Sequence, residues 1–322
     1  IGANILAARY FGAHEDEELS KTVHTSILLS LYSGVFLTVV GILGARTILI
    51  WMQCPANVLD LATLYLRIYF AGMTATMLYN FGAALLRASG DTQRPLYYLF
   101  ASGVVNVILN LVFVIYFHMD VAGVALATVI SQCLSAAFVL FFLTKKSELK
   151  LRFLHKNEIP ECTGHAKNIL SLGAAGFIMQ LTNSLVTICC NNVLSVTGGD
   201  VYISVKTIIS SVRQLVETPI HAMVEGTSPI LSYNYGARRP GRVRKSILIM
   251  SLLVFGYTAV MWSMIILIPE TLIRIFSSDA ALIQDAVPAL NMYFAAFIFM
   301  DLQYIGQAVF KSLNKKVFAI FF

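Results

Sequence analysis

A single acidic side chain, Asp301, lies in the apolar segment FIFMDLQYIGQAVF, within a run long enough to cross a membrane. A charge at the centre of a bilayer costs ~2.5–3.5 kcal/mol on insertion scales. A carboxylate kept there is a candidate for binding a cation or a proton, and a hydrogen bond between helices is the alternative role. Gln303 and Gln307, on the same segment, are candidate cavity-lining residues beside it.

A second set of ionisable residues lies on one side of the segment 201–235. At 100° per residue the set falls within an arc of about 120°. Its members are Lys206, Arg213, Glu217, His221 and Glu225. A histidine between two carboxylates at i, i+4 and i+8 could relay protons or bind a cation. The alternative is internal pairing, in which Arg213 neutralises Glu217 one turn away. We treat Arg213, Glu217, His221 and Glu225 as cavity-lining candidates.

Amide side chains occur at membrane depth in two further segments. Gln180 and Asn183 are three residues apart in one of them, and Asn106 and Asn110 share a helical face in the other. An amide oxygen can coordinate Na⁺, but an amide cannot take up a proton. We take Gln180 and Asn183 as candidate ion-coupling residues and Asn106 and Asn110 as cavity-lining candidates. Hydrogen bonding between helices is the alternative for both pairs.

The segments that must position these groups are apolar helices. Of the 322 residues, 57% are hydrophobic and 12% are charged, whereas a soluble domain has about 25% charged residues. Runs close to the ~20 residues that span a bilayer occur at about 25–45, 62–86, 96–117, 121–143, 169–196, 201–235, 246–269 and 286–310. A partial run stands at each end. The sequence predicts an all-α polytopic membrane protein.

The basic residues alternate along the chain in a way that predicts orientation. Eighteen of the 23 Lys and Arg residues lie in alternate loops and two lie in the intervening ones. Cytoplasmic loops carry the excess of positive charge. The predicted cytoplasmic segments are 12–22, 87–95, 144–168, 236–245 and 311–316. The net charge of +6 therefore reflects topology, and we predict no nucleic-acid partner.

An internal repeat appears when the chain is displaced by 224 residues. Leu66, Tyr69, Phe70 and Ala71 then fall on identical residues, and Arg87 falls on Lys311. The offset spans an even number of helices, so the two copies have the same orientation. We predict two six-helix lobes, truncated at both ends. The predicted parts are residues 1–143, a basic inter-lobe linker at 144–168, and residues 169–322.

Several motifs match one family. LLRASGDTQRP at 85–95, NVILN at 106–110, GVALATVISQ at 123–132, NNVLSVTGGD at 191–200 and GTSPILSYNYGARRPGRVRK at 226–245 carry the likeness. The sequence resembles the MATE family of multidrug and toxin extrusion antiporters, in the branch that contains many bacterial drug exporters. The resemblance covers helices two to eleven of twelve.

This resemblance implies two lobes around a cavity and export of cationic or amphipathic compounds in exchange for Na⁺ or H⁺. It further implies a multi-pass protein of the bacterial inner membrane, monomeric and surrounded by lipid. Asp301 matches an acidic position in the family's tenth helix that contributes to cation binding in some members. Asn183 falls close to where some members carry a glutamate, so this chain departs from a two-acid site there. No cofactor is implied beyond the coupling ion.

Two other functions stay open. A flippase for lipid-linked oligosaccharides would keep the fold, and cationic residues in the cavity, here Lys206 and Arg213, would favour it. A receptor without transport activity or an intramembrane enzyme is the remote alternative. The sequence contains no nucleotide-binding loop, nucleophile motif or HExxH zinc motif, so we predict neither an enzyme nor a metal site other than for Na⁺.

Overall fold

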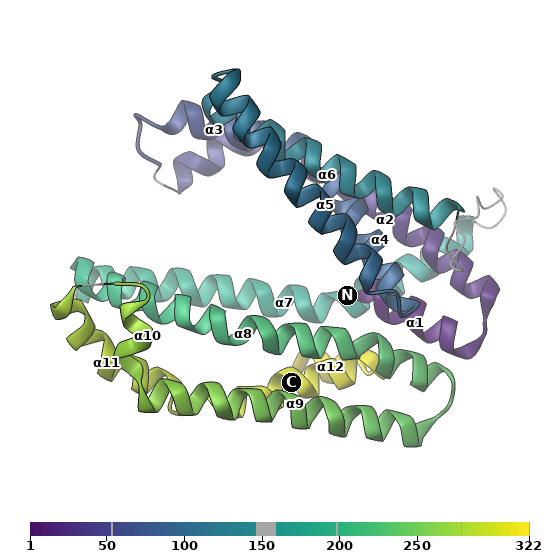
Figure 1. Cartoon of the computed structure of the whole chain (residues 1–322). Helices are drawn as coiled ribbons and strands as arrows, with labels where there is room; N and C mark the ends of the chain where they lie inside the picture. The colour runs from purple at the N-terminus through teal and green to yellow at the C-terminus, as the bar shows by residue number, and fades with distance from the viewer. Residues whose placement is uncertain (53, 146–158, 198, 278, 322) are drawn as a thin grey trace. The chain divides into compact units, whose positions relative to one another are not determined.

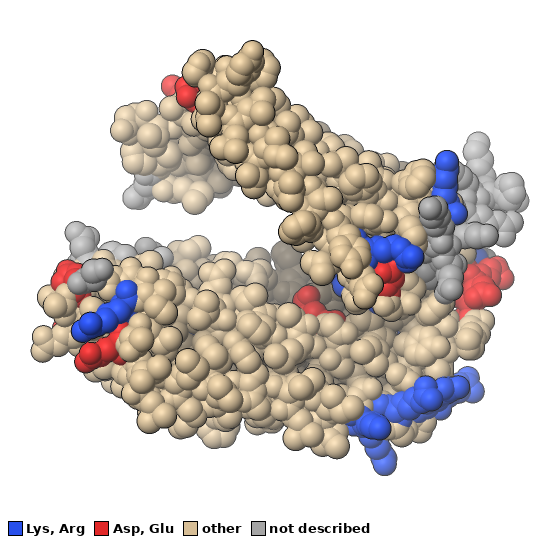
Figure 2. All heavy atoms as spheres, viewed as in Figure 1, with Lys and Arg blue, Asp and Glu red and all other residues tan. Residues whose placement is uncertain are grey.

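The computed structural model describes the whole chain except residues 53, 146–158, 198, 278 and 322. The described residues form helices and turns and contain no strand. They divide into two compact units, Ile1–Leu170 and Ser171–Phe322, which are described separately. In the view of Figure 2 most of the surface of each unit carries no charged side chain, as expected for surfaces that face lipid.

The N-terminal unit is a bundle of long helices (Figure 1). Its elements are α1 (Gly2–Ala13), α2 (Asp16–Trp51), α3 (Leu59–Ala71), α4 (Met73–Ala88), α5 (Gln93–Leu111), the π-helical turn η1 (Val112–Tyr116), α6 (Asp120–Lys145) and the first turns of α7 (Ile159–Thr197). Helix α2 begins with Asp16, Glu17 and Glu18. Acidic side chains at this position stabilise a helix, because the N-terminal end of the helix dipole is positive. Leu85 and Leu86 of α4 pack with Val139 and Leu143 of α6 in the core.

Close packing in this unit depends on a small residue in α2. A Cβ atom added at Gly34 would lie 2.7 Å from the Cα atom of Thr74 on α4. The obstructing atom belongs to the backbone, so a rotamer change cannot relieve the contact. Gly34 therefore sets how closely α2 and α4 approach.

We expect Gly34→Ala to lower the free energy of unfolding by about 1–3 kcal/mol, because the added methyl group overpacks a backbone contact. Denaturant titration in micelles measures this. Gly256→Ala on α9 is the matched control, since an added Cβ there meets nothing within 4 Å and alanine favours a helix over glycine by up to ~1 kcal/mol. Equal destabilisation of both variants would contradict the packing argument.

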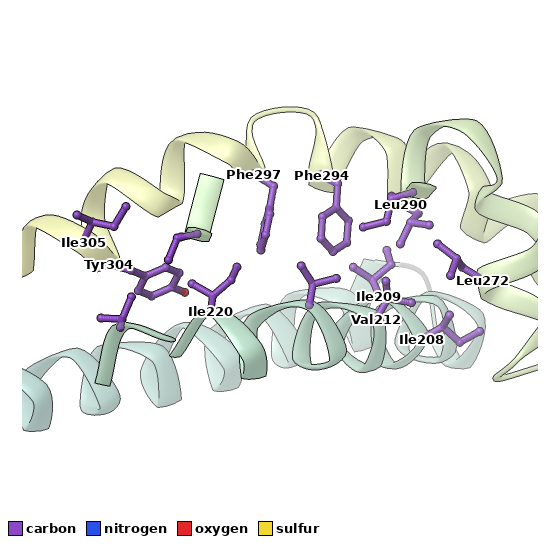
Figure 3. Close-up of a cluster of buried hydrophobic side chains, with 14 of the residues drawn as sticks. Ile208, Ile209, Val212, Ile220, Leu272, Leu290, Phe294, Phe297, Tyr304 and Ile305 are labelled. Carbon is purple, nitrogen blue, oxygen red and sulfur yellow. The ribbon is translucent and has the colours of Figure 1, made fainter. Parts of the chain in front are cut away.

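The C-terminal unit contains the rest of α7 and a set of continuous and broken helices. These are α8 (Gly199–Gly236), α9 (Pro240–Leu267), α10 (Pro269–Arg274), α11 (Ala280–Phe294), the 3₁₀ turn η3 (Phe297–Phe299), α12 (Met300–Ser312) and α13 (Lys316–Phe321). Figure 3 shows apolar side chains of α8 pointing toward those of α11, η3 and α12. Ile220, Leu290 and Phe294 are fully buried there. This core fixes the rotation of α8 about its own axis, and with it the direction in which the charged residues of α8 point.

Two runs predicted as single spans contain a break in the α-helix. The run 62–86 divides at Gly72 into α3 and α4, which are bent by 45°. The run 286–310 lies in one candidate span, Ala280–Ser312, which passes through η3 between α11 and α12. There Trp262 of α9 donates its indole N–H to the carbonyl oxygen of Phe294 (2.9 Å). A carbonyl freed by a helix break needs such a partner at membrane depth.

The number of spans also differs from the prediction of eight. By length and composition six helices of the described chain could cross a membrane, or seven if α3 and α4 count as one span. Helix α8 has 38 residues but does not qualify, because its polar and charged residues lower its hydropathy.

The same turns recur 224 residues apart. The residue that ends α1, His14, has φ 58° and the equivalent residue after α8, Arg238, has φ 54°. Gly90 and Asn314 likewise share positive φ values of 88° and 60°. The helices that follow His14 and Arg238 are α2 and α9. They begin at Asp16 and Pro240, which are also 224 residues apart. The backbone of each unit thus carries these turns at the spacing predicted for the repeat.

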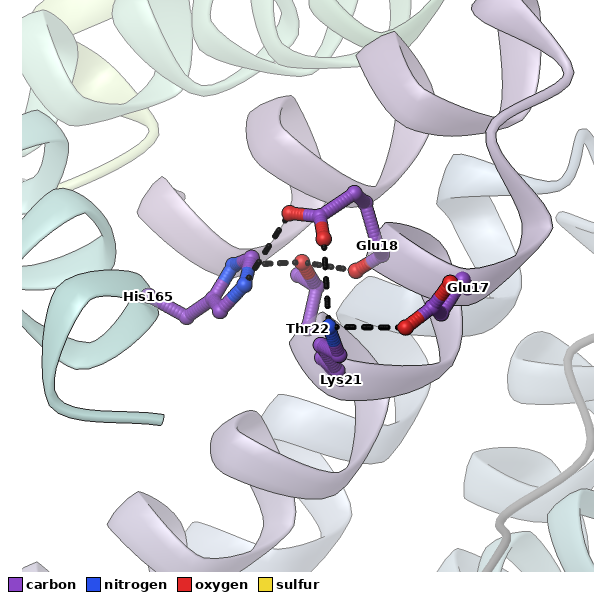
Figure 4. Close-up of polar contacts among 5 residues, drawn as sticks. All are labelled: Glu17, Glu18, Lys21, Thr22 and His165. Carbon is purple, nitrogen blue, oxygen red and sulfur yellow. Dashed lines mark hydrogen bonds and ion pairs between the residues drawn. The ribbon is translucent and has the colours of Figure 1, made fainter. Parts of the chain in front are cut away.

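The first turns of α7 belong to the N-terminal unit. His165, 7% exposed, lies with Nε2 3.3 Å from Oε2 of Glu18 and Nδ1 3.3 Å from Oγ1 of Thr22. Lys21 pairs with Glu17 at 2.9 Å beside it (Figure 4). Residues 159–168 of the predicted linker 144–168 lie in α7, and the rest of that predicted linker lies largely outside the described residues. The division between the units falls after Leu170.

Candidate functional site

Asp301 lies in the first turn of α12, directly after the helix break, and is fully buried. Its Oδ1 accepts a hydrogen bond from the hydroxyl of Thr258 on α9 (3.1 Å). Its Oδ2 is buried without a hydrogen-bond partner. No Lys or Arg among the described residues forms an ion pair with it. A carboxylate buried in this way is a group that can hold a proton or a cation.

The charged face of α8 is paired internally. Arg213 donates from Nε to Oε1 of Glu217 (2.7 Å), and Tyr304 of α12 donates its hydroxyl to the same oxygen (3.0 Å). Arg213 also donates from Nη1 to the hydroxyl of Tyr293 on α11 (2.8 Å). The His221 ring packs edge-on against Tyr304, with 4.7 Å between centroids. Glu217 thus has a cation and a hydroxyl as partners, in contrast to Asp301.

A cavity of about 560 Å³ lies between α7, α8 and α11 of this unit. Its polar lining includes Lys206, Arg213 and Asp285, together with Tyr202 and Tyr293. Its remaining lining is largely apolar: Val186, Leu194, Val205, Ile209, Pro288, Ala289 and Met292. Charges of both signs on an apolar and aromatic wall can hold an amphipathic organic molecule.

A chain of contacts runs from this cavity toward Asp301. Arg213 lines the cavity and bonds to Glu217, which accepts from Tyr304. Tyr304 stands three residues after Asp301 on α12, so the two lie on adjacent turns of one helix. Side chains of α8 and α12 therefore lead from the cavity to the helical turn next to Asp301.

The other candidates on α7 and α12 are not joined to Asp301. Gln180 and Asn183 are exposed on α7, and Gln303 is exposed on α12. Gln307 is buried, but it accepts from Lys311 and donates to the carbonyl of Ala319 in α13. Within the described part of the chain, no hydrogen bond connects any of these amides with Asp301 or with the cavity. Glu225 is exposed and acts electrostatically on Lys311.

Asn106 and Asn110 belong to a polar cluster in the N-terminal unit. Asn106 donates toward the hydroxyls of Thr128 (3.4 Å) and Ser131 (3.3 Å) on α6. Asn110 donates to Oδ1 of Asn106 (3.1 Å). These contacts tie α5 to α6, which is the hydrogen-bonding role considered as the alternative to cavity lining.

Five residues of the site are not among the sequence candidates: Tyr202, Thr258, Asp285, Tyr293 and Tyr304. Asp285 precedes the predicted span 286–310, and Thr258 is one of many hydroxyls in apolar runs. A usable signal existed for Asp285. The α11 residues that line the cavity are Asp285, Pro288, Ala289, Met292 and Tyr293. Their spacing of three and four residues marks one helical face.

The described residues contain no group of three or more His, Cys, Asp or Glu side chains that could hold a metal ion. The described cysteines form no disulfide with one another: Cys54, Cys133, Cys162, Cys189 and Cys190. A Na⁺ site would therefore need oxygen donors of other residue types beside an acid, such as the Thr258 hydroxyl beside Asp301.

Comparison with known families decides the classification. The family model MatE matches residues 1–112 and 175–322, which include α8, α12 and the buried acid. The chain belongs to the MatE family. As a MatE protein with at least six helices of membrane-spanning length, it is a multi-pass membrane protein. Multidrug transporters of this family are not enzymes.

Curated MatE relatives are distant but extend over most of the chain. It is 26% identical over 292 residues to the probable multidrug resistance protein NorM of Thermotoga maritima, covering 88% of this chain and 61% of the relative. It is 22% identical over 315 residues to the multidrug export protein MepA of Staphylococcus haemolyticus, covering 98% and 69%. The chain therefore spans about two thirds of the length of these relatives.

Solved MATE structures share the fold. A MATE crystal structure in a bent conformation superimposes with a TM-score of 0.91 at 22% identity, covering 99% of this chain and 70% of that one. A transporter of the MOP superfamily from Pyrococcus furiosus superimposes with a TM-score of 0.88 at 22% identity, covering 99% and 71%. A reversed polarity of the binding pocket has been taken to suggest a different function for that transporter.

Proposed function

We propose that this MatE protein belongs to a secondary active exporter that moves cationic or amphipathic compounds outward in exchange for Na⁺ or H⁺. The observation that carries the proposal is Asp301: fully buried, bonded only through Oδ1, and without a cation partner among the described residues. Binding of an ion or a proton there offsets the cost of the buried charge.

The cavity between α7, α8 and α11 is the proposed substrate site. Asp285 supplies an acid for a positively charged substrate, and Tyr202 and Tyr293 supply rings on which a flat cation can stack. Asn183 and Gln180, exposed on α7, remain proposed contributors to ion coupling in another state of the transporter. Alternating access of the two units would then expose the substrate to either side of the membrane.

The proposed setting follows from the charge distribution and the family. The protein acts as a monomer in the bacterial inner membrane, with segments 12–22, 87–95, 144–168, 236–245 and 311–316 in the cytoplasm. The alternation of basic loops supports this orientation. Its partners are lipids and small-molecule substrates, and it needs no cofactor other than the coupling ion.

Efflux from reconstituted vesicles tests the proposal. Vesicles are loaded with a cationic dye, and Na⁺ and proton gradients are imposed separately. We expect one gradient to drive extrusion of the dye and an ionophore that collapses this gradient to stop it. Dye movement at the rate of protein-free vesicles under both gradients would refute the proposal.

One observation favours a second function. The cavity contains two cations, Lys206 and Arg213, and one acid, Asp285, so it also fits a lipid-linked oligosaccharide, whose pyrophosphate is anionic. The same vesicles distinguish the two. A flippase would equilibrate a fluorescent lipid-linked sugar between leaflets without a Na⁺ or proton gradient, whereas the exporter would leave it in place.

A further inference from the structure

Five cations cluster at the turn that joins α8 and α9. All five are exposed, and together they are called the basic turn: Arg238, Arg239, Arg242, Arg244 and Lys245. Figure 2 shows them as a blue area on the C-terminal unit. No acidic residue occurs in the sequence between Glu225 and Glu270. Within the described part of the chain, none of the five forms an ion pair.

The corresponding turn of the N-terminal unit shows that this charge is not needed to build the turn. Its end residue, His14, has the same left-handed conformation as Arg238. The N–H of Glu15 bonds to the carbonyl of Tyr10, as that of Arg239 bonds to Asn234. There the next helix begins with acids and its Lys21 is paired with Glu17 and Glu18. The same backbone conformation of the turn thus occurs with acidic residues after α1 and with basic residues after α8.

The positive charge at the start of α9 is unfavourable in isolation. The first turn of α9 contains no acid, although a helix N-terminus favours negative charge and disfavours positive charge. Arg242 stands in that turn, and the neighbouring cations repel one another. An anion bound at this position would offset the unfavourable helix dipole and the repulsion among the cations. A guanidinium group can donate two hydrogen bonds to one phosphate.

The surface next to the basic turn is apolar. Leu248, Ile249, Leu252 and Leu253 of α9 are 59%, 46%, 65% and 56% exposed. Arg242, Lys245, Ile249 and Leu252 recur at steps of three and four residues, so they lie on one face of α9. Lys245 and Leu252 are about 10 Å apart along the helix axis. Positive and lipid-facing surfaces are therefore continuous on one helix.

We propose that the basic turn binds the headgroup of an anionic phospholipid, whose acyl chains lie along Ile249 and Leu252 of α9. A soluble phosphate or a nucleic acid would use the cations but would leave the adjoining apolar face unused. Anionic lipids attract basic residues that stand next to a membrane span. The predicted cytoplasmic position of this turn places it at the leaflet rich in such lipids.

Lipid binding to the complete chain in a neutral detergent tests the proposal. Phosphatidylglycerol and phosphatidylcholine are titrated separately, and bound lipid is counted by native mass spectrometry. The test variant is Arg242→Gln/Lys245→Gln. The matched control, Arg46→Gln/Arg274→Gln, also removes two cations, each of which is paired with an acid at the other predicted side of the membrane.

We expect phosphatidylglycerol to bind the unmodified protein in preference to phosphatidylcholine. Each cation near a headgroup contributes about fivefold to affinity, so the test variant should lose roughly 20-fold. The control variant should bind as the unmodified protein does, and Arg242→Lys/Lys245→Arg, which keeps the charge, should retain most of the binding. High salt should weaken binding.

Four results would overturn the proposal. The first is equal binding of the two lipids. The second is an equal loss of phosphatidylglycerol in the test and control variants. The third is complete displacement of phosphatidylglycerol by millimolar inorganic pyrophosphate, since a soluble anion would then be the ligand. Circular dichroism of each variant shows whether the helices are intact, and a folded test variant with unchanged lipid affinity would count against the proposal.

Discussion

Replacement of Asp301 by asparagine is expected to reduce gradient-driven efflux to the level of protein-free vesicles. Asparagine has nearly the same shape and still accepts the hydrogen bond from Thr258, which lies 3.1 Å from the carboxylate. It cannot take up a proton, and it carries no charge to hold a cation. The dye-efflux assay under Na⁺ and proton gradients measures the loss.

The fold should survive this substitution. Asp301 is fully buried without a cation partner among the described residues, so removal of its charge relieves a desolvation cost instead of breaking an ion pair. We expect the unfolding midpoint of Asp301→Asn to stay level or rise. Glu270→Gln, which removes a surface acid 4.0 Å from Arg274, is the control and should transport normally. Unchanged efflux by Asp301→Asn would exclude Asp301 as the coupling site.

The helices could be predicted because their cause is local. Runs of apolar residues near the length of a bilayer identify α6 within two residues at each end, whereas α2 and α9 begin nine and six residues before their predicted runs, in polar sequence. The break between α11 and α12 could not be found in this way. It involves the indole of Trp262, which comes from α9 and bonds to the carbonyl of Phe294. A contact of this kind depends on tertiary structure and leaves no periodic signal in the broken segment.

The site was predictable to the extent that a charge in an apolar run is costly. Asp301 and Glu217 were both selected on this ground. The sequence could not show that their surroundings differ, because their partners come from other helices: Thr258 for Asp301, and Tyr304 with Arg213 for Glu217. Asp285 was missed because it precedes the predicted run, although it lines the cavity.

Glu217→Gln is expected to act in the opposite way to Asp301→Asn. It should lower the free energy of unfolding by about 2–4 kcal/mol, because it leaves the partly buried Arg213 without its acid partner. The side chains of Arg213 and Glu217 are 30% and 15% exposed, so water replaces little of the lost interaction. Denaturant titration in micelles measures the change. Tyr304→Phe removes one hydrogen bond to the Glu217 carboxylate and leaves its pair with Arg213 in place, so it should cost about 1.5–3 kcal/mol.

The double variant Arg213→Gln/Glu217→Gln tests whether the two residues neutralise each other. If they do so and thereby let a polar helix pack, the double variant should recover more than half of the stability lost in Glu217→Gln. Denaturant titration in micelles is the readout, because Arg213 also lines the cavity proposed for the substrate. A double variant no more stable than Glu217→Gln would contradict mutual neutralisation. Two acids in one unit thus differ in their partners: Glu217 is paired with Arg213 and Tyr304, whereas Asp301 accepts only the Thr258 hydroxyl among the described residues.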